Sequence, residues 1–163
     1  MSIRSMLIAG LFLAWVSSGQ AAEKVNHELA CDWDHFKGPN SDASSPEKGL
    51  LRQWPEGGPK LLWKAKTGRG WSCPSAAGND VVICSKEASA WKETILCLDA
   101  STGTERWKYT YEVEPYWKAK NCGGWSQGGV TSTPAVTDKY VCAMGRTGEL
   151  HCLDRATGAV KWH

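Results

Sequence analysis

Short runs of apolar and β-branched residues recur through the second half of the chain. Each run is bounded by Gly, Asp or Thr-Gly, a pattern typical of short β-strands joined by turns. Gly145–Gly148 lies between two of these runs and predicts a tight hairpin. Beyond residue 21 no long stretch shows the apolar period of about 3.6 residues expected of an amphipathic helix, which excludes helical repeats and indicates an all-β chain. The runs are Val81–Cys84, Thr94–Leu98, Tyr140–Met144 and Glu149–Leu153.

Two segments of the chain are repeated in the same order. Cys97–Trp107 matches Cys152–Trp162 almost residue for residue, and Ser72–Ile83 matches Ser132–Ala143. The first copy is longer, and we expect its additional residues in the connection Lys86–Thr94. Each copy predicts four antiparallel strands: around the Ser-x-Pro motif, in the Val-rich run, in the Cys-Leu-Asp run and at the Trp. Four short strands in about 40–45 residues are typical of a β-propeller blade.

Each copy ends in the pattern Asp-x-x-x-Gly-x-x-x-Trp. The Asp carboxylate can accept backbone N–H groups of the turn, and the Gly supplies a positive φ angle. The Trp ring projects from the outermost strand, where burial against the next blade would contribute about 2–3 kcal/mol. Because catalytic groups are rarely repeated from blade to blade, the two aspartates are predicted to stabilise turns, and no catalytic residue is assigned. The structural repeat positions are Asp99, Gly103, Trp107, Asp154, Gly158 and Trp162.

An earlier blade is indicated upstream of the two copies. Leu61–Thr67 looks like the outer strand of the repeat, with Trp63 in the place of Trp107, but no Asp-x-x-x-Gly turn precedes it. The predicted fold is therefore a β-propeller with four-stranded antiparallel blades, of which the chain holds about two in full and part of another. Propellers close with about 4–8 blades. These 163 residues are accordingly expected to be a fragment of a longer propeller, or to assemble with further blades.

The composition is that of a globular chain, with 42% hydrophobic and 22% charged residues. Lys and Arg total 19 against 17 Asp and Glu, so a net charge of +2 gives no basic surface for nucleic acid. The chain contains 10 Trp but only 2 Phe, which fits a Trp that recurs with each repeat.

The N-terminus is predicted to be a secretory signal peptide. Arg4 provides the positive charge, Met6–Val16 is an apolar run, and Ser17–Ala21 offers small residues for cleavage. The apolar run is too short to span a bilayer, so no membrane span is expected after removal of the signal. The protein is predicted to be exported and to be periplasmic or extracellular, with an outer-membrane association also open. The predicted domains are residues 1–21 as signal, 22–59 as a segment leading into the first blade, and 60–163 as propeller repeats.

The chain contains 7 cysteines. Export would permit disulfides, but an odd number leaves at least one thiol without an intrachain partner, and no connectivity is predicted. No C-x-x-C motif occurs, so no metal site is assigned. Four cysteines lie within strand-like runs and are expected to be small buried hydrophobic residues. These are Cys84, Cys97, Cys142 and Cys152.

The repeated tail resembles the tryptophan-docking repeat of the pyrroloquinoline-quinone-type (PQQ-like) β-propellers. Asp32–Asp42 is similar to the Trp-Pro-x-Phe-Arg-Gly-Pro-Asn-x-Asp-Gly start of exported bacterial members, and Trp54–Trp63 is also similar to that group. The departures are Asp34 for Pro, Lys37 for Arg and Ala43 for Gly. The resemblance covers about residues 32–163 and implies the propeller fold.

The resemblance implies two functional classes. One comprises the non-catalytic, BamB-like scaffold propellers, and the other the quinoprotein dehydrogenases, which use PQQ and Ca²⁺ to oxidise alcohols or sugars. Dehydrogenases of this group commonly carry adjacent cysteines over the quinone, and this chain has no Cys-Cys pair. We therefore expect a binding or assembly platform in the cell envelope, with envelope proteins or further blades as partners and no identifiable cofactor. The alternative is the N-terminal part of a PQQ-dependent dehydrogenase.

A Trp-rich insertion, Tyr116–Trp125, interrupts the repeat. It mixes aromatic and basic side chains, and a loop in this place would lie on one rim of a propeller. It is the candidate for partner or ligand contacts, the alternative being a surface loop whose aromatic rings pack on a neighbouring blade. The residues concerned are Trp117, Lys118, Lys120 and Trp125.

Overall fold

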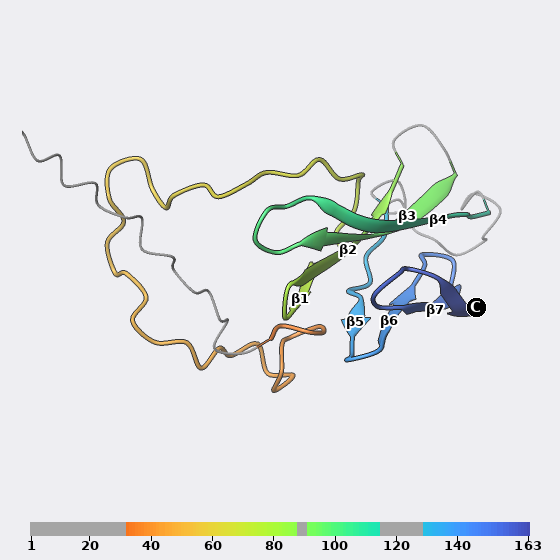
Figure 1. Ribbon diagram of the computed structural model, residues 1–163, viewed down its shortest axis with the longest axis horizontal. Helices are drawn as coiled ribbons and strands as arrows, with labels where there is room; N and C mark the ends of the chain where they lie inside the picture. The colour runs from red at the N-terminus through yellow and green to blue at the C-terminus, as the bar shows by residue number, and fades with distance from the viewer. Residues whose placement is uncertain (1–31, 88–90, 115–128) are drawn as a thin grey trace, which may run out of the picture.

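The computed structural model describes residues 32–87, 91–114 and 129–163. These residues form eight β-strands and no α-helix (Figure 1). No described segment is a helix of the length and apolarity that crossing a membrane requires. The predicted signal peptide lies outside the described residues. The strands are β1 Ser75–Ala77, β2 Asp80–Lys86, β3 Lys92–Asp99, β4 Glu105–Glu112, β5 Ala135–Val136, β6 Tyr140–Met144, β7 Leu150–Asp154 and β8 Val160–Trp162.

The strands form two four-stranded antiparallel sheets, each in sequence order. We call β1-β2-β3-β4 the first blade and β5-β6-β7-β8 the second blade. Their first strands begin directly after Pro74 and Pro134, where a residue without an N–H group can precede a strand but not continue its ladder. The prediction of an all-β chain with four-stranded antiparallel blades is confirmed.

The first copy is longer because its strands β2 and β3 are longer than β6 and β7, so the prediction that the additional residues lie in the connection Lys86–Thr94 is wrong. In the first blade the hairpin pairs continue to Lys86 opposite Glu93, whereas in the second they end at Met144 opposite Leu150. Cross-strand pairing satisfies the backbone groups of the additional residues, which a longer loop would leave to solvent. The first blade therefore has the longer β2–β3 hairpin. The tight hairpin predicted at Gly145–Gly148 is confirmed by a hydrogen bond from Gly145 N to Glu149 O (2.7 Å).

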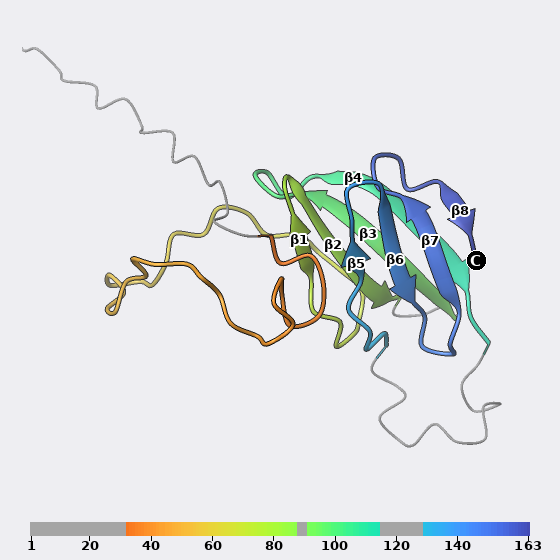
Figure 2. The same cartoon turned by 90° about the horizontal axis from the view of Figure 1, so that it is seen from below.

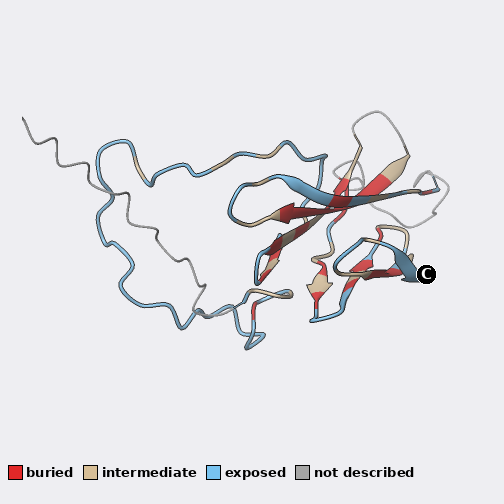
Figure 3. Cartoon of the chain, in the orientation of Figure 1, coloured by how far each residue is buried: buried red, intermediate tan, exposed pale blue. Residues whose placement is uncertain are grey.

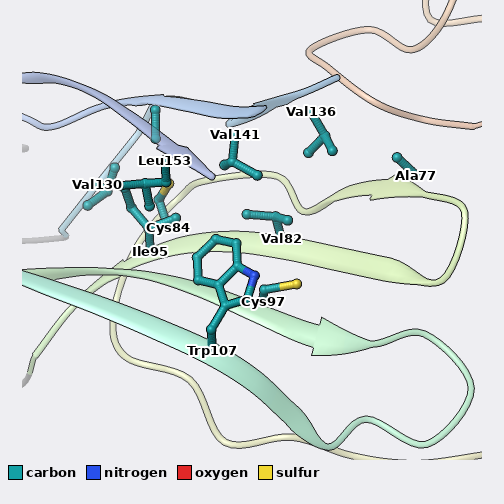
Figure 4. Close-up of a cluster of buried hydrophobic side chains, with 11 residues drawn as sticks. Ala77, Val82, Cys84, Ile95, Cys97, Trp107, Val130, Val136, Val141 and Leu153 are labelled. Carbon is teal, nitrogen blue, oxygen red and sulfur yellow. The ribbon is translucent and has the colours of Figure 1, made fainter. Parts of the chain in front are cut away.

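The two blades pack face to face. Figure 2 shows the second blade lying over the first, and Figure 3 shows buried residues concentrated on the strands that face each other. Side chains of a strand alternate between its two faces, so one face of each blade supplies this core (Figure 4). The core residues are Ala77, Val82, Cys84, Ile95, Cys97, Trp107, Val130, Val136, Val141, Ala143 and Leu153.

The N-terminal segment joins the innermost strands of both blades. Trp33 exchanges two backbone hydrogen bonds with Ala76 (2.7 and 2.9 Å), and Asp34 O accepts one from Val136 N (2.8 Å). The chain then leaves the sheets in a long excursion before it returns to the first blade (Figure 1). Leu61–Thr67, predicted as an outer strand, is not a strand. No inner strands of an earlier blade lie beside it among the described residues, so its backbone has no ladder to join.

Candidate functional site

Trp107 joins the first blade to the second. Its ring lies against Gly158, its Nε1 donates a hydrogen bond to Arg155 O (2.7 Å), and only 7% of the residue is exposed. Gly158 has φ +72°, and a Cβ at this position would come within 2.7 Å of the Trp107 ring. The glycine is therefore required twice, for the positive φ angle and for the close approach of the ring.

Trp63 makes the same contact one blade earlier. Its Nε1 donates to Ala100 O (2.9 Å), and a Cβ at Gly103 would lie 2.5 Å from its ring. Trp63 reaches this position from an irregular segment, whereas Trp107 reaches its own from β4. Docking of the ring therefore does not depend on the strand that usually carries it.

The aspartates of the repeat organise the turns that receive the rings. Asp99 Oδ1 accepts hydrogen bonds from the backbone N of Ser101 and Thr102 (3.0 Å each), and Asp154 Oδ1 accepts them from Ala156 and Thr157 (3.1 Å each). Hydrogen bonding, led by the Ser101 hydroxyl, lowers the pKa of Asp99. The pKa of Asp154 is lowered mainly by its contact with Lys161. Both carboxylates are thus ionised turn residues.

A charged groove of about 460 Å³ opens where the turns of the two blades meet. Asp80 lies at its base and pairs with Arg106 and with Arg155 Nε (2.7 Å). Arg155 also donates to Ala77 O (2.7 Å) in the first blade and to Thr137 O (3.1 Å) in the second. The guanidinium therefore links the two blades through backbone as well as charge. The cations that line the groove are Arg106, Lys139, Arg155 and Lys161.

A buried polar cluster lies at another place between the blades. Glu93 is fully buried, and its Oε2 accepts hydrogen bonds from the Tyr111 hydroxyl (2.9 Å) and from Arg146 N (3.1 Å). Its Oε1 has no hydrogen-bond partner among the described atoms. His151 is 3% exposed, and its ring lies 4.0 Å from that of Tyr111, centroid to centroid.

Burial decides the charge state of this cluster. It is the main cause that raises the pKa of Glu93 and lowers that of His151, because both charged forms lose hydration. Burial, with the neighbouring Glu93 carboxylate, also raises the pKa of Tyr111. The cluster therefore favours neutral side chains and holds the blades together through hydrogen bonds and ring contacts.

The comparisons with known proteins agree with these repeats. Residues 92–163 match the family model described as outer membrane protein assembly factor BamB. This segment carries PQQ-like repeats. The predicted resemblance is thus confirmed, and the chain is a propeller-type protein.

Two relatives illustrate how much of a longer protein the chain covers. It is 33% identical over 116 residues to the serine/threonine-protein kinase AfsK of Streptomyces griseus, an alignment covering 71% of this chain and 13% of the kinase. The crystal structure of BamB from Moraxella catarrhalis is 22% identical with a TM-score of 0.35, over 58% of this chain and 22% of that one. The chain spans less than a quarter of either protein.

The second PQQ-like blade exposes apolar side chains on the face turned away from the first blade. On β6, Tyr140 and Met144 alternate with the buried Val141 and Ala143. Met144 lies opposite Leu150 on β7, and Trp162 on β8 lies opposite Cys152. We call this surface the outer face, and its large side chains are between 42% and 50% exposed. They are Tyr140, Met144, Leu150 and Trp162.

Other predicted residues are not brought into these sites. Trp117, Lys118, Lys120 and Trp125 lie outside the described residues. In the part of the chain that the structure describes, no three His, Cys, Asp or Glu side chains are placed to hold a metal ion.

Sequence reasoning missed the groove and the buried cluster. Arg155 replaces the small Ala100 of the first copy within an otherwise matching tail, and that difference between repeats was the available signal. Glu93 gave a weaker signal, because it was expected in the connection Lys86–Thr94, where a Glu is usually solvated. Its burial depends on Tyr111 and Arg146, which the fold brings to it from other strands and turns.

Proposed function

We propose that this chain acts as a non-catalytic binding or assembly platform in the cell envelope. The match of residues 92–163 to a family described as an outer-membrane assembly factor supports this role and an envelope location. The observation that carries the proposal is this match, and the apolar outer face of the second blade is a surface for a partner protein or a further blade to cover.

The outer face has the chemistry of a protein-binding surface. Clustered exposed apolar side chains commonly mark interaction sites, and aromatic residues and Met are enriched at interface centres. Tyr140 belongs both to this face and to the wall of the charged groove. An apolar centre therefore adjoins a charged rim, the arrangement that gives contact area from the centre and orientation from the rim.

The proposal is tested by capture of partners from envelope extracts. Wild-type protein, a Met144→Asp variant and a Leu62→Asp variant would be immobilised, and the proteins recovered with each would be quantified. Met144 lies on the outer face, whereas Leu62 is equally apolar and 62% exposed but lies in the N-terminal excursion. We expect Met144→Asp to reduce specific recovery at least tenfold, corresponding to about 1.4 kcal/mol, and Leu62→Asp to leave it unchanged.

Two results would overturn the platform. One is the absence of any specifically recovered protein, or equal recovery with all three baits. The other is tight co-purification of PQQ and Ca²⁺ with dye-linked oxidation of alcohols or sugars, which would establish the alternative dehydrogenase function.

A further inference from the structure

Two cysteines lie directly opposite each other on the outer face of the second blade. Cys142 on β6 pairs with Cys152 on β7, next to the pair formed by Met144 and Leu150. Opposite residues in an antiparallel ladder have Cα atoms about 4.5–5.5 Å apart, within the range of about 4.4–6.8 Å that disulfides need. The register therefore places the two side chains on the same face of the sheet, directly across from each other.

The other described cysteines are not paired in this way. Cys97 lies opposite Val82, and Cys84 lies opposite Ile95. Cys97 directs its thiol to Asp80 Oδ1 (3.6 Å), and burial raises the pKa of both Cys84 and Cys97 to about 12. These two thiols face the core between the blades. The strand register therefore places two cysteines opposite each other in the second blade but not in the first.

Cys142 and Cys152 differ in their exposure to solvent. Cys142 is half-buried, whereas Cys152 is 4% exposed and lies opposite Trp162. A reagent in solution can therefore reach Cys142 first, with Cys152 directly opposite it on the neighbouring strand. The prediction that both are buried hydrophobic residues holds for Cys152, whereas Cys142 is only half-buried, because its side chain lies on the face turned away from the first blade.

We propose that Cys142 and Cys152 form a cross-strand disulfide when the folded chain meets a small disulfide oxidant. The Cys142 thiolate attacks one sulfur of the oxidant, breaks its S–S bond and releases one thiol. The Cys152 thiolate then attacks the Cys142 sulfur of the mixed disulfide and releases the second thiol. Two electrons and two protons pass from the cysteine pair to the oxidant, which leaves as two thiols.

The environment of Cys142 sets the pH dependence of this step. Burial, followed by the contact with Cys152, raises the pKa of the Cys142 thiol. Since the thiolate is the nucleophile, the rate of oxidation should rise by about tenfold for each pH unit below that pKa. The chemistry lies within one hairpin and does not depend on the proposed platform function.

The test is a map of disulfides in the full-length protein. Folded protein would be treated with glutathione disulfide, quenched by alkylation and digested with trypsin without reduction. Arg146 separates the two cysteines, so their disulfide joins peptides 140–146 and 147–155 into one species that is two hydrogen atoms lighter than their sum. We expect this species to be the main oxidised product, and its yield to be lost in Cys142→Ser and Cys152→Ser but kept in Cys97→Ser.

A disulfide between Cys73 and Cys84 is the control for closeness in the sequence. They have nearly the same separation in sequence as the proposed pair, but Cys84 is buried and Cys73 lies in an irregular exposed segment. In urea both pairs should oxidise to similar extents. In the folded protein the yield of the Cys142–Cys152 disulfide should exceed that of a Cys73–Cys84 disulfide at least tenfold. Equal yields in the folded protein, or alkylation of both Cys142 and Cys152 after oxidant treatment, would overturn the proposal.

Discussion

At the scale of single residues, each turn of the repeat depends on a ring from the preceding part of the chain. Gly103 and Gly158 have nearly the same φ angles, +71° and +72°, and each lies against an indole. The ring occupies the space that a Cβ would take, and its Nε1 satisfies a carbonyl of the turn. A glycine in this position is therefore a packing residue as well as a turn residue.

We predict that Gly158→Ala destabilises the protein more than Gly148→Ala does. Both glycines have positive φ angles, but nothing lies within 4 Å of a Cβ at Gly148. Gly148→Ala should lose about 1–2 kcal/mol from backbone strain, and Gly158→Ala about 3 kcal/mol because the Trp107 ring must also move. Urea denaturation followed by Trp fluorescence measures both, and equal losses would contradict a packing role for Gly158.

The buried Glu93 predicts a specific pH dependence of stability. Burial raises its pKa above the usual 4.5, so the unfolded chain loses this proton at lower pH than the folded chain. The stability that Glu93 contributes is complete below about pH 4.5 and is lost as pH rises through its folded pKa. Glu93→Gln stays neutral and keeps an acceptor for the Tyr111 hydroxyl.

The free energy of unfolding of Glu93→Gln should therefore fall less than that of wild type as pH rises from about 4.5 to 7. His151 contributes with the opposite sign, because its pKa is lowered and stability is lost as pH falls through it. That contribution is common to both proteins and cancels in the comparison. Urea denaturation at a series of pH values gives the two profiles, and parallel profiles would show that Glu93 keeps an ordinary pKa.

At the scale of elements, the Arg155 side chain connects the two blades. Its side chain contacts the end of β1, the Thr137 turn that follows β5 and the carboxylate of Asp80 on β2. Each of these contacts uses a different N–H group of a planar fork, which no other side chain reproduces.

We predict that Arg155→Lys loses about 2–3 kcal/mol of stability although it keeps the charge, because the two carbonyls lose their donors. Lys161→Ala is the matched control, since it removes a cation of the same groove that contacts Asp154 (3.1 Å) from an exposed position. An exposed pair of this kind contributes about 0–1 kcal/mol. Thermal unfolding of the two variants checks the difference, and a Lys variant as stable as wild type would remove the argument for the fork.

The repeats made the elements predictable, but not the contacts between them. The runs around Val82, Cys97, Cys142 and Cys152 predicted four central strands because apolar β-branched residues bounded by turns have few other conformations. The prediction of a strand at Leu61–Thr67 is wrong because a strand also needs a neighbouring strand to pair with, which the local residue pattern does not report. The groove and the Glu93 cluster join residues far apart in sequence, which periodicity does not report.

At the scale of the whole molecule, the first blade makes contacts both with the N-terminal excursion and with the second blade. Trp63 docks on the turn at Ala100, and Trp33 forms a β-bridge with Ala76 at the edge strand β1. Between Ala43 and Trp63 the chain is mostly exposed and makes few hydrogen bonds. Trp63 is the point at which this excursion is fixed again to the sheets.

We predict that Trp63→Ala speeds limited proteolysis on the C-terminal side of that residue. Trypsin should cut after Lys64 and Lys66 several-fold faster in the variant, because local opening no longer breaks a docked ring. Cleavage after Arg52, which is exposed and distant from Trp63 in the sequence, should be unchanged. Mass spectrometry of timed digests measures each site, and unchanged cleavage after Lys64 would show that Trp63 does not anchor the segment.

The docked rings also set an order of events during synthesis. The ribosome makes Trp63 before Gly103 and Trp107 before Gly158, so each ring exists before the turn that will receive it. At about 5–20 residues per second, Trp107 waits about 3–10 s for its turn. Between the synthesis of each Trp and the synthesis of its turn, the nascent chain therefore carries an uncovered indole. Each new turn then meets a ring that has already been made. Assembly of such repeats proceeds from the N-terminus, with the hazard of exposed Trp confined to the most recently made blade.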